Sequence, residues 1–532
     1  MQARRDALSK VFPSPLGGNP NIFLTALLFR FRSPPLGTVC PGCLTTGYAF
    51  RYFSRAERGW KRRLGYGIIN MWRNSSAHEE LEIGKMTYKE AEHRLKACGQ
   101  EQVLRYWKAL SEKQRKALLA QIATIDPASV VRCRAALEAG VEAVDNSKGK
   151  APKVDVLKGA ALKRAVEAGE KELENGRVAA LLVAGGQGSR LGFDGPKGCY
   201  PIGPLTDAPL FYYHARKILA RELRYETTIP FYIMTSEANN AATIRCFEEN
   251  DYFGLNPDDV FFFTQGMWPG MTKDGEIILD EPGHIFMSPD GHGGLLAALD
   301  RSGALDDMKE RGVTSVFFFQ VDNPLVEIAD PAFIGYHVLK DSDYSLKLCA
   351  KSDPFEKVGI PMKFGPAYRM VEYSEMTEEQ CLRKTAKGEL YFKYGSPAIH
   401  VFDRDFLARE AKEAMPLHLA FKKIPCVNGK GKVVKPSEPN GYKFEKFIFD
   451  ILPKAKTAAF LAFDPKDEFS PVKNAEGKDS PDTCRADMQD KWRRMLAAAG
   501  VSCAAGVPVE IDPVYALDAA DLESLGLLLL VD

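Results

Sequence analysis

The stretch Leu182-Val-Ala-Gly-Gly-Gln-Gly-Ser-Arg-Leu-Gly192 decides how the middle of the chain folds. It closes the apolar run Val178–Ala184, which we predict to be a buried strand. The glycines that follow let the backbone approach a ligand without interference from a Cβ atom. Their amide groups can point at phosphate oxygens or at a base edge. The predicted nucleotide-binding glycines are Gly185, Gly186 and Gly188.

Two cations follow this strand, Arg190 within the loop and Lys197 seven residues later. We expect both to reach one polyphosphate. The dinucleotide pattern G-x-G-x-x-G fails, because Leu191 occupies its last glycine position when counted from Gly186. The P-loop pattern fails too, because no Gly-Lys-Ser/Thr follows. A nicotinamide-dependent dehydrogenase is therefore disfavoured, although it stays an alternative.

Two further loops carry candidate chemistry. Met287-Ser-Pro-Asp-Gly-His-Gly-Gly294 precedes a predicted helix, whose first amides favour an anion or a polar ligand. His292 within it either contacts a substrate hydroxyl or is merely exposed. The apolar run Val316–Val321 delivers Asp322 to the carboxyl edge of a sheet, where ligands bind in open α/β folds. A carboxylate there suits Mg²⁺ shared with substrate phosphates; the alternative is a turn aspartate before Asn-Pro.

Apolar, β-branched or aromatic runs alternate with helical stretches beyond residue 178, which predicts a mostly parallel sheet with crossover helices. The predicted strands are Val178–Ala184, Phe231–Thr235, Val260–Thr264, Ser315–Val321 and Ser345–Cys349. The predicted helices between them are Phe211–Arg224, Asn239–Asn250, Leu295–Asp307 and Pro331–Leu339. The stretch 345–402 is expected to be richer in antiparallel strand.

Residues 86–145 have helical periodicity, in the stretches Lys89–Ala97, Glu101–Lys108 and Ser111–Ile125, and a further helix is predicted over Leu157–Asn175. The predicted division is a helical segment at 86–176, a catalytic domain at 177–420 and a small C-terminal domain at 421–532. The overall class is α/β.

Composition narrows the possible functions. The 532 residues are 45% hydrophobic and 27% charged, with a net charge of +1. This balance disfavours nucleic-acid binding, and the apolar runs are too short to span a bilayer, so we expect a soluble, cytoplasmic protein. Residues 1–75 carry 12 Lys and Arg but only two acidic residues. We predict that residues 1–85 are a leader outside the fold; it is a transit peptide, a basic arm or an appendage before a later start.

Several ordered motifs give this chain a family resemblance. It resembles the UDP-sugar pyrophosphorylases, and most of all the eukaryotic-type UDP-N-acetylhexosamine branch. The matching strings are Leu182–Lys197, Gln265–Met267, Ser288–Gly294, Val321–Asn323, Val371–Glu375, Asn440–Asp450 and Asp467–Asn474. The resemblance implies a Rossmann-like nucleotidyltransferase domain with a mixed, mostly parallel sheet, a helical N-terminal part and a small C-terminal domain. It also implies that UTP and a sugar 1-phosphate give a UDP-sugar and pyrophosphate with Mg²⁺.

The resemblance assigns roles by position. Gly185, Gly186, Gly188, Gln265 and Gly291 are expected at the nucleotide; Arg190, Lys197 and Lys443 at the phosphates; Asp322 at Mg²⁺; and His292, Gly359, Glu372 and His400 at the sugar. Three of these have simpler alternatives. Lys443 is read on a helix with Lys446 and could be a solvated charge. Glu372 could face water on a strand, and Gln265 could cap one. His400 could instead contact a phosphate or lie near the metal.

Two departures bear on the sugar. The acetylhexosamine enzymes typically carry asparagine where this chain has His292, and their Gly-Asn-Ile-Ala-Asn-His appears here as Gly395-Ser-Pro-Ala-Ile-His400. We expect N-acetylglucosamine 1-phosphate as substrate. Glucose 1-phosphate or a broader set of sugars is the alternative, and a non-catalytic UDP-sugar-binding protein is a more remote one. The expected partners are these substrates, with neither nucleic acid nor membrane; the sequence leaves the oligomeric state open.

Overall fold

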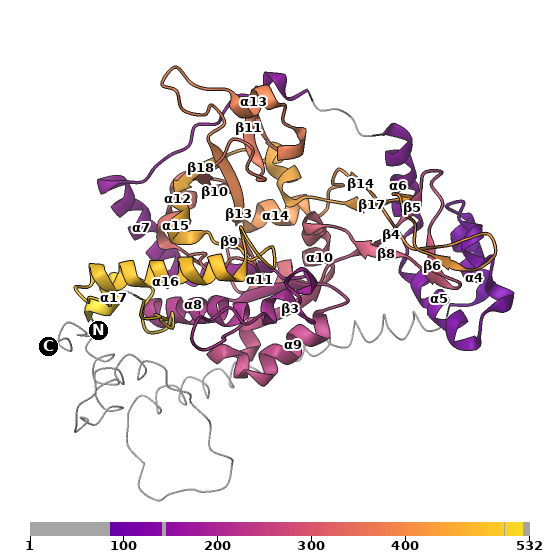
Figure 1. The fold of residues 1–532 in the computed structure, drawn as a ribbon, viewed down its shortest axis with the longest axis horizontal. Helices are drawn as coiled ribbons and strands as arrows, with labels where there is room; N and C mark the ends of the chain where they lie inside the picture. The colour runs from indigo at the N-terminus through magenta and orange to yellow at the C-terminus, as the bar shows by residue number, and fades with distance from the viewer. Residues whose placement is uncertain (1–85, 141–144, 505, 525–532) are drawn as a thin grey trace, which may run out of the picture.

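The computed structural model describes residues 86–140, 145–504 and 506–524 (Figure 1). The predicted leader and its Cys40-Pro-Gly-Cys43 pair lie outside these ranges. The described chain forms a large lobe around a central sheet and a smaller lobe that contains the first helices. Within the described ranges, no helix is both long and apolar enough to cross a membrane.

The large lobe contains a seven-stranded sheet in the order β18-β10-β13-β9-β1-β2-β3. β13 pairs antiparallel with both of its neighbours, and the other pairs are parallel. The predicted mixed, mostly parallel α/β sheet is therefore confirmed. In chain order the strands are β1 (Val178–Val183), β2 (Phe231–Thr235), β3 (Val260–Thr264), β9 (Ser315–Gln320), β10 (Tyr344–Ala350), β13 (Tyr394–Asp403) and β18 (Ala458–Phe463).

Helices cover both faces of this sheet, because successive strand side chains point to opposite sides. Ala180 and Leu182 of β1 pack in one core, and Ala179 and Leu181 pack in the other. The first core is covered by α7 (Gly159–Glu174), α8 (Leu210–Tyr225), α9 (Asn240–Glu249) and α12 (Pro331–Leu339). The second is covered by α10 (Leu295–Arg301), α11 (Ala304–Glu310) and α14 (Arg404–Glu410).

The smaller lobe is assembled from three distant parts of the chain. Its helices are α4 (Tyr88–Lys96), α5 (Glu112–Thr124) and α6 (Pro127–Ala139). They share a buried core with residues from 268–287 and 417–444, such as Trp268, Ile285 and Phe444. The short strands there are β4 (Met267–Pro269), β5 (Met271–Thr272), β6 (Leu279–Glu281), β7 (His284–Ile285), β8 (Met287–Pro289), β14 (His418–Lys422), β15 (Cys426–Val427), β16 (Val433–Val434) and β17 (Gly441–Glu445). Packing thus groups the segments differently from the linear division at 176 and 420.

Three local predictions are wrong. The stretch Leu295–Asp307 forms two helices, because Gly303 between them adopts a left-handed φ of +76°. The stretch Glu101–Lys108 contains 3₁₀ turns in place of an α-helix. Lys443 lies on β17, not on a helix, since that segment pairs with β14. Local periodicity does not register such long-range pairing.

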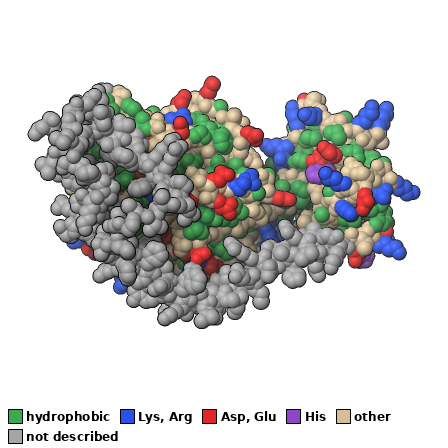
Figure 2. All heavy atoms as spheres, turned by 90° about the horizontal axis from the view of Figure 1, so that it is seen from below, with side chains coloured by type: hydrophobic (Ala, Val, Ile, Leu, Met, Phe, Trp, Pro, Cys, Tyr) green, Lys and Arg blue, Asp and Glu red, His purple; other side chains and the backbone are tan. Residues whose placement is uncertain are grey.

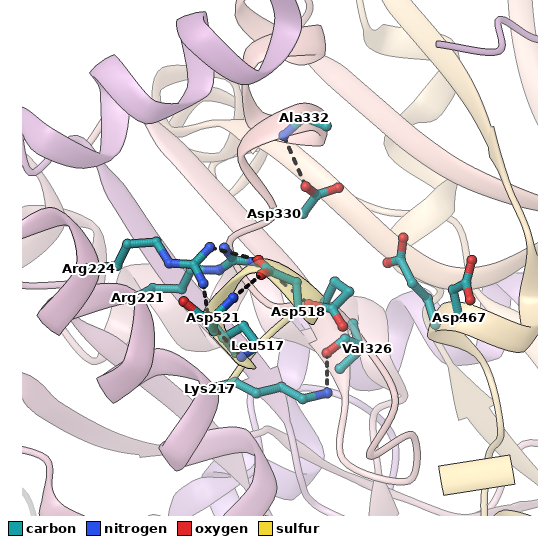
Figure 3. A network of polar contacts seen from close by, with 12 residues as sticks. Lys217, Arg221, Arg224, Val326, Asp330, Ala332, Asp467, Leu517, Asp518 and Asp521 are labelled. Carbon is teal, nitrogen blue, oxygen red and sulfur yellow. Dashed lines mark hydrogen bonds and ion pairs between the residues drawn. The ribbon is translucent and has the colours of Figure 1, made fainter. Parts of the chain in front are cut away.

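The C-terminal segment is fastened to α8 by ion pairs. It contains α15 (Pro465–Glu468), α16 (Pro481–Ala498) and α17 (Ala519–Ser524). Arg216 pairs with Asp512 at 2.6 Å, and Arg224 pairs with Asp518 at 3.0 Å and also with Asp521. Figure 3 shows the Arg224 guanidinium directed at the α17 end, and Lys217 on the same helix donating to the Val326 carbonyl. Helix α8 thus contacts both the central sheet and the C-terminal segment.

Gly335 permits close contact between α7 and α12. A Cβ atom on Gly335 would lie 1.7 Å from the Ala165 carbonyl oxygen. Glycine to alanine normally favours a helix by about 1 kcal/mol, but forcing two helices apart costs about 1–3 kcal/mol. We therefore expect Gly335→Ala to lower the thermal unfolding midpoint. Val338→Ala, at an exposed position of α12, should leave it nearly unchanged; an equal or higher midpoint for Gly335→Ala would contradict the packing.

Candidate active site

The glycine loop after β1 is held closed by its own backbone. The Gly188 amide donates to the Gly195 carbonyl at 2.9 Å, and the Lys197 amide donates to the Gly186 carbonyl at 3.0 Å. Gly188 is buried, and a Cβ there would lie 2.7 Å from the Phe193 ring, so packing alone requires glycine. Gly186 is exposed, with nothing within 4 Å of an added Cβ. Gly186 is therefore the glycine that a ligand can approach freely.

A buried asparagine that sequence reasoning missed supports this loop. The Asn239 side-chain amide donates to the carbonyls of Ala184 at 2.9 Å and Gly186 at 3.2 Å. It precedes α9, directly beyond the β2 strand end. Its only signal in the sequence was its place after a predicted strand. Asn239 thus fixes the backbone whose amides are available to a ligand.

Gln265 closes the other side of the loop. It follows β3, and its amide donates to the Thr235 carbonyl at 2.9 Å. Its side chain is buried so close to Gly185 that a Cβ on this glycine would lie 2.9 Å from Nε2. The structure therefore brings Gly185 and Gln265 together, as their shared predicted role requires.

The loop of Gly291 is docked on the strand that carries Lys443. The Lys446 amide donates to the Asp290 carbonyl, and the Gly293 amide donates to the Lys446 carbonyl, each at 2.8 Å. Gly291 has a φ of +80°, and a Cβ there would lie 2.5 Å from the Lys446 carbonyl oxygen. Only glycine fits this close approach.

A buried ion pair reinforces the same contact. The Lys446 ammonium lies 3.5 Å from the Asp290 carboxylate, and both residues are buried. Burial raises the pKa of Asp290 and lowers the pKa of Lys446, while their opposite charges counteract both shifts. Lys446 is therefore a structural cation and not a solvated charge. Lys443 is half-buried, with its ammonium 5.2 Å from the centre of the Phe286 ring.

Asp322 and Lys197 meet through the C-terminal segment. The Val472 amide donates to the Asp322 carbonyl at 2.8 Å, and the Lys197 ammonium donates to the Val472 carbonyl at 3.3 Å. Asn323 binds the same segment, because its side chain donates to the Glu468 carbonyl at 2.7 Å and accepts from the Ser470 amide at 3.0 Å. One strand end, one glycine loop and one distant segment therefore converge. Arg190 is exposed on the same loop as Lys197.

Asp322 fits a magnesium ion that is shared with a substrate. The residue is half-buried, and its side chain makes no hydrogen bond or ion pair with any other described residue. Across the described ranges, no group of three or more His, Cys, Asp or Glu could form a metal site from protein ligands alone. Mg²⁺ is commonly held by one or two carboxylates together with substrate phosphates and water. A half-buried, unpaired carboxylate beside the glycine loop suits that mode.

Gly359 and Glu372 lie side by side on the sugar side of the predicted site. A Cβ on Gly359 would lie 3.5 Å from Oε1 of Glu372. Gly359 precedes β11 (Ile360–Phe364), and Glu372 follows β12 (Ala367–Val371), which pairs with β11. Burial, followed by the charge of Glu375, raises the pKa of Glu372. Glu372 is thus half-buried and is not an ordinary solvated strand residue.

The predicted sugar residue His400 and its neighbour Ile399 are both buried. His400 is 1% exposed and stacks on Phe318 with ring centres 5.3 Å apart. Burial lowers the pKa of His400 to about 3, so the ring is neutral and offers no cation to a phosphate. A contact of His400 with a phosphate, as predicted, would therefore be a hydrogen bond from a neutral ring. Ile399 packs in the opposite core.

The chain is similar in sequence to one known protein family over most of its length. The family model of UTP–glucose-1-phosphate uridylyltransferase matches residues 133–478. The chain belongs to this family. The human UDP-N-acetylhexosamine pyrophosphorylase-like protein 1 is 38% identical over 431 residues, which are 76% of this chain and 85% of that protein. The UDP-N-acetylglucosamine pyrophosphorylase of Saccharomyces cerevisiae is 35% identical over 443 residues, which are 78% of this chain and 92% of that protein.

A solved structure agrees with both the fold and the family. The uridine diphosphate N-acetylglucosamine pyrophosphorylase of Trypanosoma brucei, solved with an inhibitor, superposes with a TM-score of 0.70. It is 28% identical, and the match covers 84% of this chain and 91% of that one. Family membership makes this chain a uridylyltransferase, so the dehydrogenase alternative is wrong. In Figure 2 the molecular surface narrows between the two lobes.

Gly186→Ala tests the approach to the loop. We expect the variant to fold normally, because no atom lies within 4 Å of the added Cβ and its φ is not left-handed. The Michaelis constant for UTP should rise about tenfold or more, since the methyl group displaces the closely approaching ligand. Gly429→Ala, which also meets nothing within 4 Å, is the matched control and should leave the constant unchanged. Equal constants for both variants would remove Gly186 from the site.

Proposed function

We propose that the protein transfers the uridylyl group of UTP to N-acetylglucosamine 1-phosphate, in a magnesium-dependent reaction. The observation that carries this proposal is the joining of Asp322 and Lys197 through the Val472 peptide, beside a glycine loop. A carboxylate, an ammonium and free backbone amides can together hold a nucleoside triphosphate. The names of the human, yeast and trypanosomal relatives favour an N-acetylated hexosamine as the sugar.

The reaction follows from charge placement. A phosphate oxygen of the sugar 1-phosphate attacks the α-phosphorus of UTP in line, and the bond to the β-phosphate breaks to release pyrophosphate. Lys197 and Arg190 offset the negative charge on the phosphates and on the leaving pyrophosphate, while Lys443 approaches from β17. Such catalysis depends on positioning and charge stabilisation more than on covalent chemistry. Asp322 would hold Mg²⁺, which when bound neutralises phosphate charge.

The experiment that tests this function measures pyrophosphate release from UTP and Mg²⁺ with three acceptors: the 1-phosphates of N-acetylglucosamine, N-acetylgalactosamine and glucose. We expect the highest kcat/KM with N-acetylglucosamine 1-phosphate. A preference for glucose 1-phosphate would show that the protein is a UTP–glucose-1-phosphate uridylyltransferase. UDP-sugar binding without turnover would instead show a binding protein.

The variant Asp322→Ala tests the proposed role of this carboxylate in the reaction. Loss of one oriented charge at a reacting phosphate typically costs about 100- to 1,000-fold in turnover. We expect that loss, together with a weaker dependence of the rate on Mg²⁺. Turnover close to that of the unmodified protein would place the metal and the phosphates elsewhere.

His292→Asn tests the departure at the sugar. An asparagine side chain offers both a donor and an acceptor, whereas a neutral imidazole with one nitrogen occupied offers only one of them. One additional hydrogen bond is worth about 1 kcal/mol, or roughly fivefold. The kcat/KM ratio of N-acetylglucosamine to glucose 1-phosphate should therefore rise about fivefold. An unchanged ratio would mean that residue 292 does not face the sugar.

A further inference from the structure

Three aromatic rings from distant parts of the chain stack at the predicted sugar position. Phe447 lies between two imidazoles, with ring centres 5.2 Å from His292 and 4.2 Å from His418. The interplanar angles are 19° and 30°, so both contacts are stacked. His418 begins β14, which pairs with β17, the strand that ends just before Phe447. The stack thus joins the small lobe to the glycine loop of His292.

One carboxylate holds one end of this stack. The His418 Nε2 donates to Oδ2 of Asp450 at 2.9 Å, and the Phe447 amide donates to the same oxygen at 3.3 Å. Asp450 therefore ties the His418 ring to the turn that begins at Phe447. The next amide along the chain, that of Ile448, donates to Nδ1 of His292 at 3.1 Å. His418 and His292 are therefore linked through Asp450 and the Phe447–Ile448 backbone, whose successive amides bond Asp450 and His292.

These contacts fix the tautomer of His292. Burial lowers its pKa to about 4, so the ring is neutral near pH 7. A neutral imidazole whose Nδ1 accepts a hydrogen bond carries its proton on Nε2. The free nitrogen of His292 is therefore a donor. Its natural partner is an oxygen acceptor, such as a sugar hydroxyl or the carbonyl of an acetamido group.

We propose that His418 and Asp450 are positioning residues that hold His292 as a hydrogen-bond donor toward the sugar of the sugar 1-phosphate. The proposal rests on the proposed function for the identity of that ligand. The tautomer of His292 does not depend on the proposed function, because it is a property of the protein alone. The orientation of the imidazole at position 292 is thus set from the neighbouring lobe.

The pair has a defined pH dependence. Burial lowers the pKa of His418, but the hydrogen bond and charge of Asp450, then the charges of Glu375 and Glu372, outweigh it and raise the pKa. The titratable groups around the His418 ring are Asp450, Glu372, Glu375, His292 and its cross-strand partner Glu445. A raised pKa means that the charged pair is complete below the ordinary histidine pKa and is lost as pH rises through the folded value. The Michaelis constant for sugar 1-phosphate should therefore rise as the pH rises above the ordinary histidine range and His418 loses its charge.

His418→Phe keeps a ring in the stack and removes the bond to Asp450. We expect the Michaelis constant for sugar 1-phosphate to rise about tenfold or more, as loss of a hydrogen bond to a charged group implies. The constant for UTP should change less than about twofold, and the rise with pH should flatten. Asp450→Asn, which preserves the shape, should show the same pattern. The matched control is His284→Phe, because His284 also bonds an aspartate, Asp280, at 2.6 Å on the distant β6–β7 hairpin.

A spectroscopic measurement separates this inference from the proposed function. Protein labelled with ¹⁵N-histidine reports the tautomer of each ring, and the His292 signal is the one that His292→Asn removes. We expect the Nε2–H tautomer in the unmodified protein and a mixture of tautomers in His418→Phe. An Nδ1–H signal in the unmodified protein, or an unchanged signal in His418→Phe, would overturn the positioning role. An absence of turnover with every sugar would overturn the proposed function while leaving the tautomer result valid.

Discussion

The site depends on one buried charge. Lys347 is 1% exposed, and its ammonium lies 2.8 Å from Asp330 and 2.6 Å from Glu468. An unpaired ammonium at this depth would cost several kcal/mol, so the two carboxylates are required and raise the pKa of Lys347. The ion pair with Lys347 holds Glu468 against β10. The residues that follow Glu468 then reach Asp322, just beyond the end of β9. The contact between Val472 and Asp322 follows from that anchor.

Close contact between two backbone segments determines the shape of the predicted nucleotide site. Gly291 and its neighbours lie so close to the 445–447 backbone that side chains would collide. The buried Asp290–Lys446 pair reinforces the contact. Phe444 of β17 packs in the core of the smaller lobe. The contact between the Gly291 loop and residues 445–447 therefore also positions that lobe against the sheet. The N-terminal helices therefore support the site without supplying a predicted ligand contact.

The sugar side differs in chemistry. His292 stacks on an aromatic ring, and Ile399 is buried in the core. His292 is held by Phe447 and the Ile448 amide, so its single free donor has a fixed direction. A fixed donor can discriminate between oxygen acceptors, since a misplaced partner leaves a desolvated group unpaired. The proposed contact of His292 with the sugar thus depends on the packing of the neighbouring lobe.

The sequence by itself determined the elements whose signal is local. Apolar runs placed Phe231–Thr235 and Val260–Thr264 with the bounds that the structure shows, and the glycine loop with Asp322 predicted a nucleotide site at the sheet edge. Only the tertiary structure decided that Lys443 lies on a strand, that Lys446 is buried and that His418 reaches His292 through Phe447. The physical reason is that strand pairing, ion-pair burial and ring stacking join residues far apart in the chain. No local periodicity encodes those contacts.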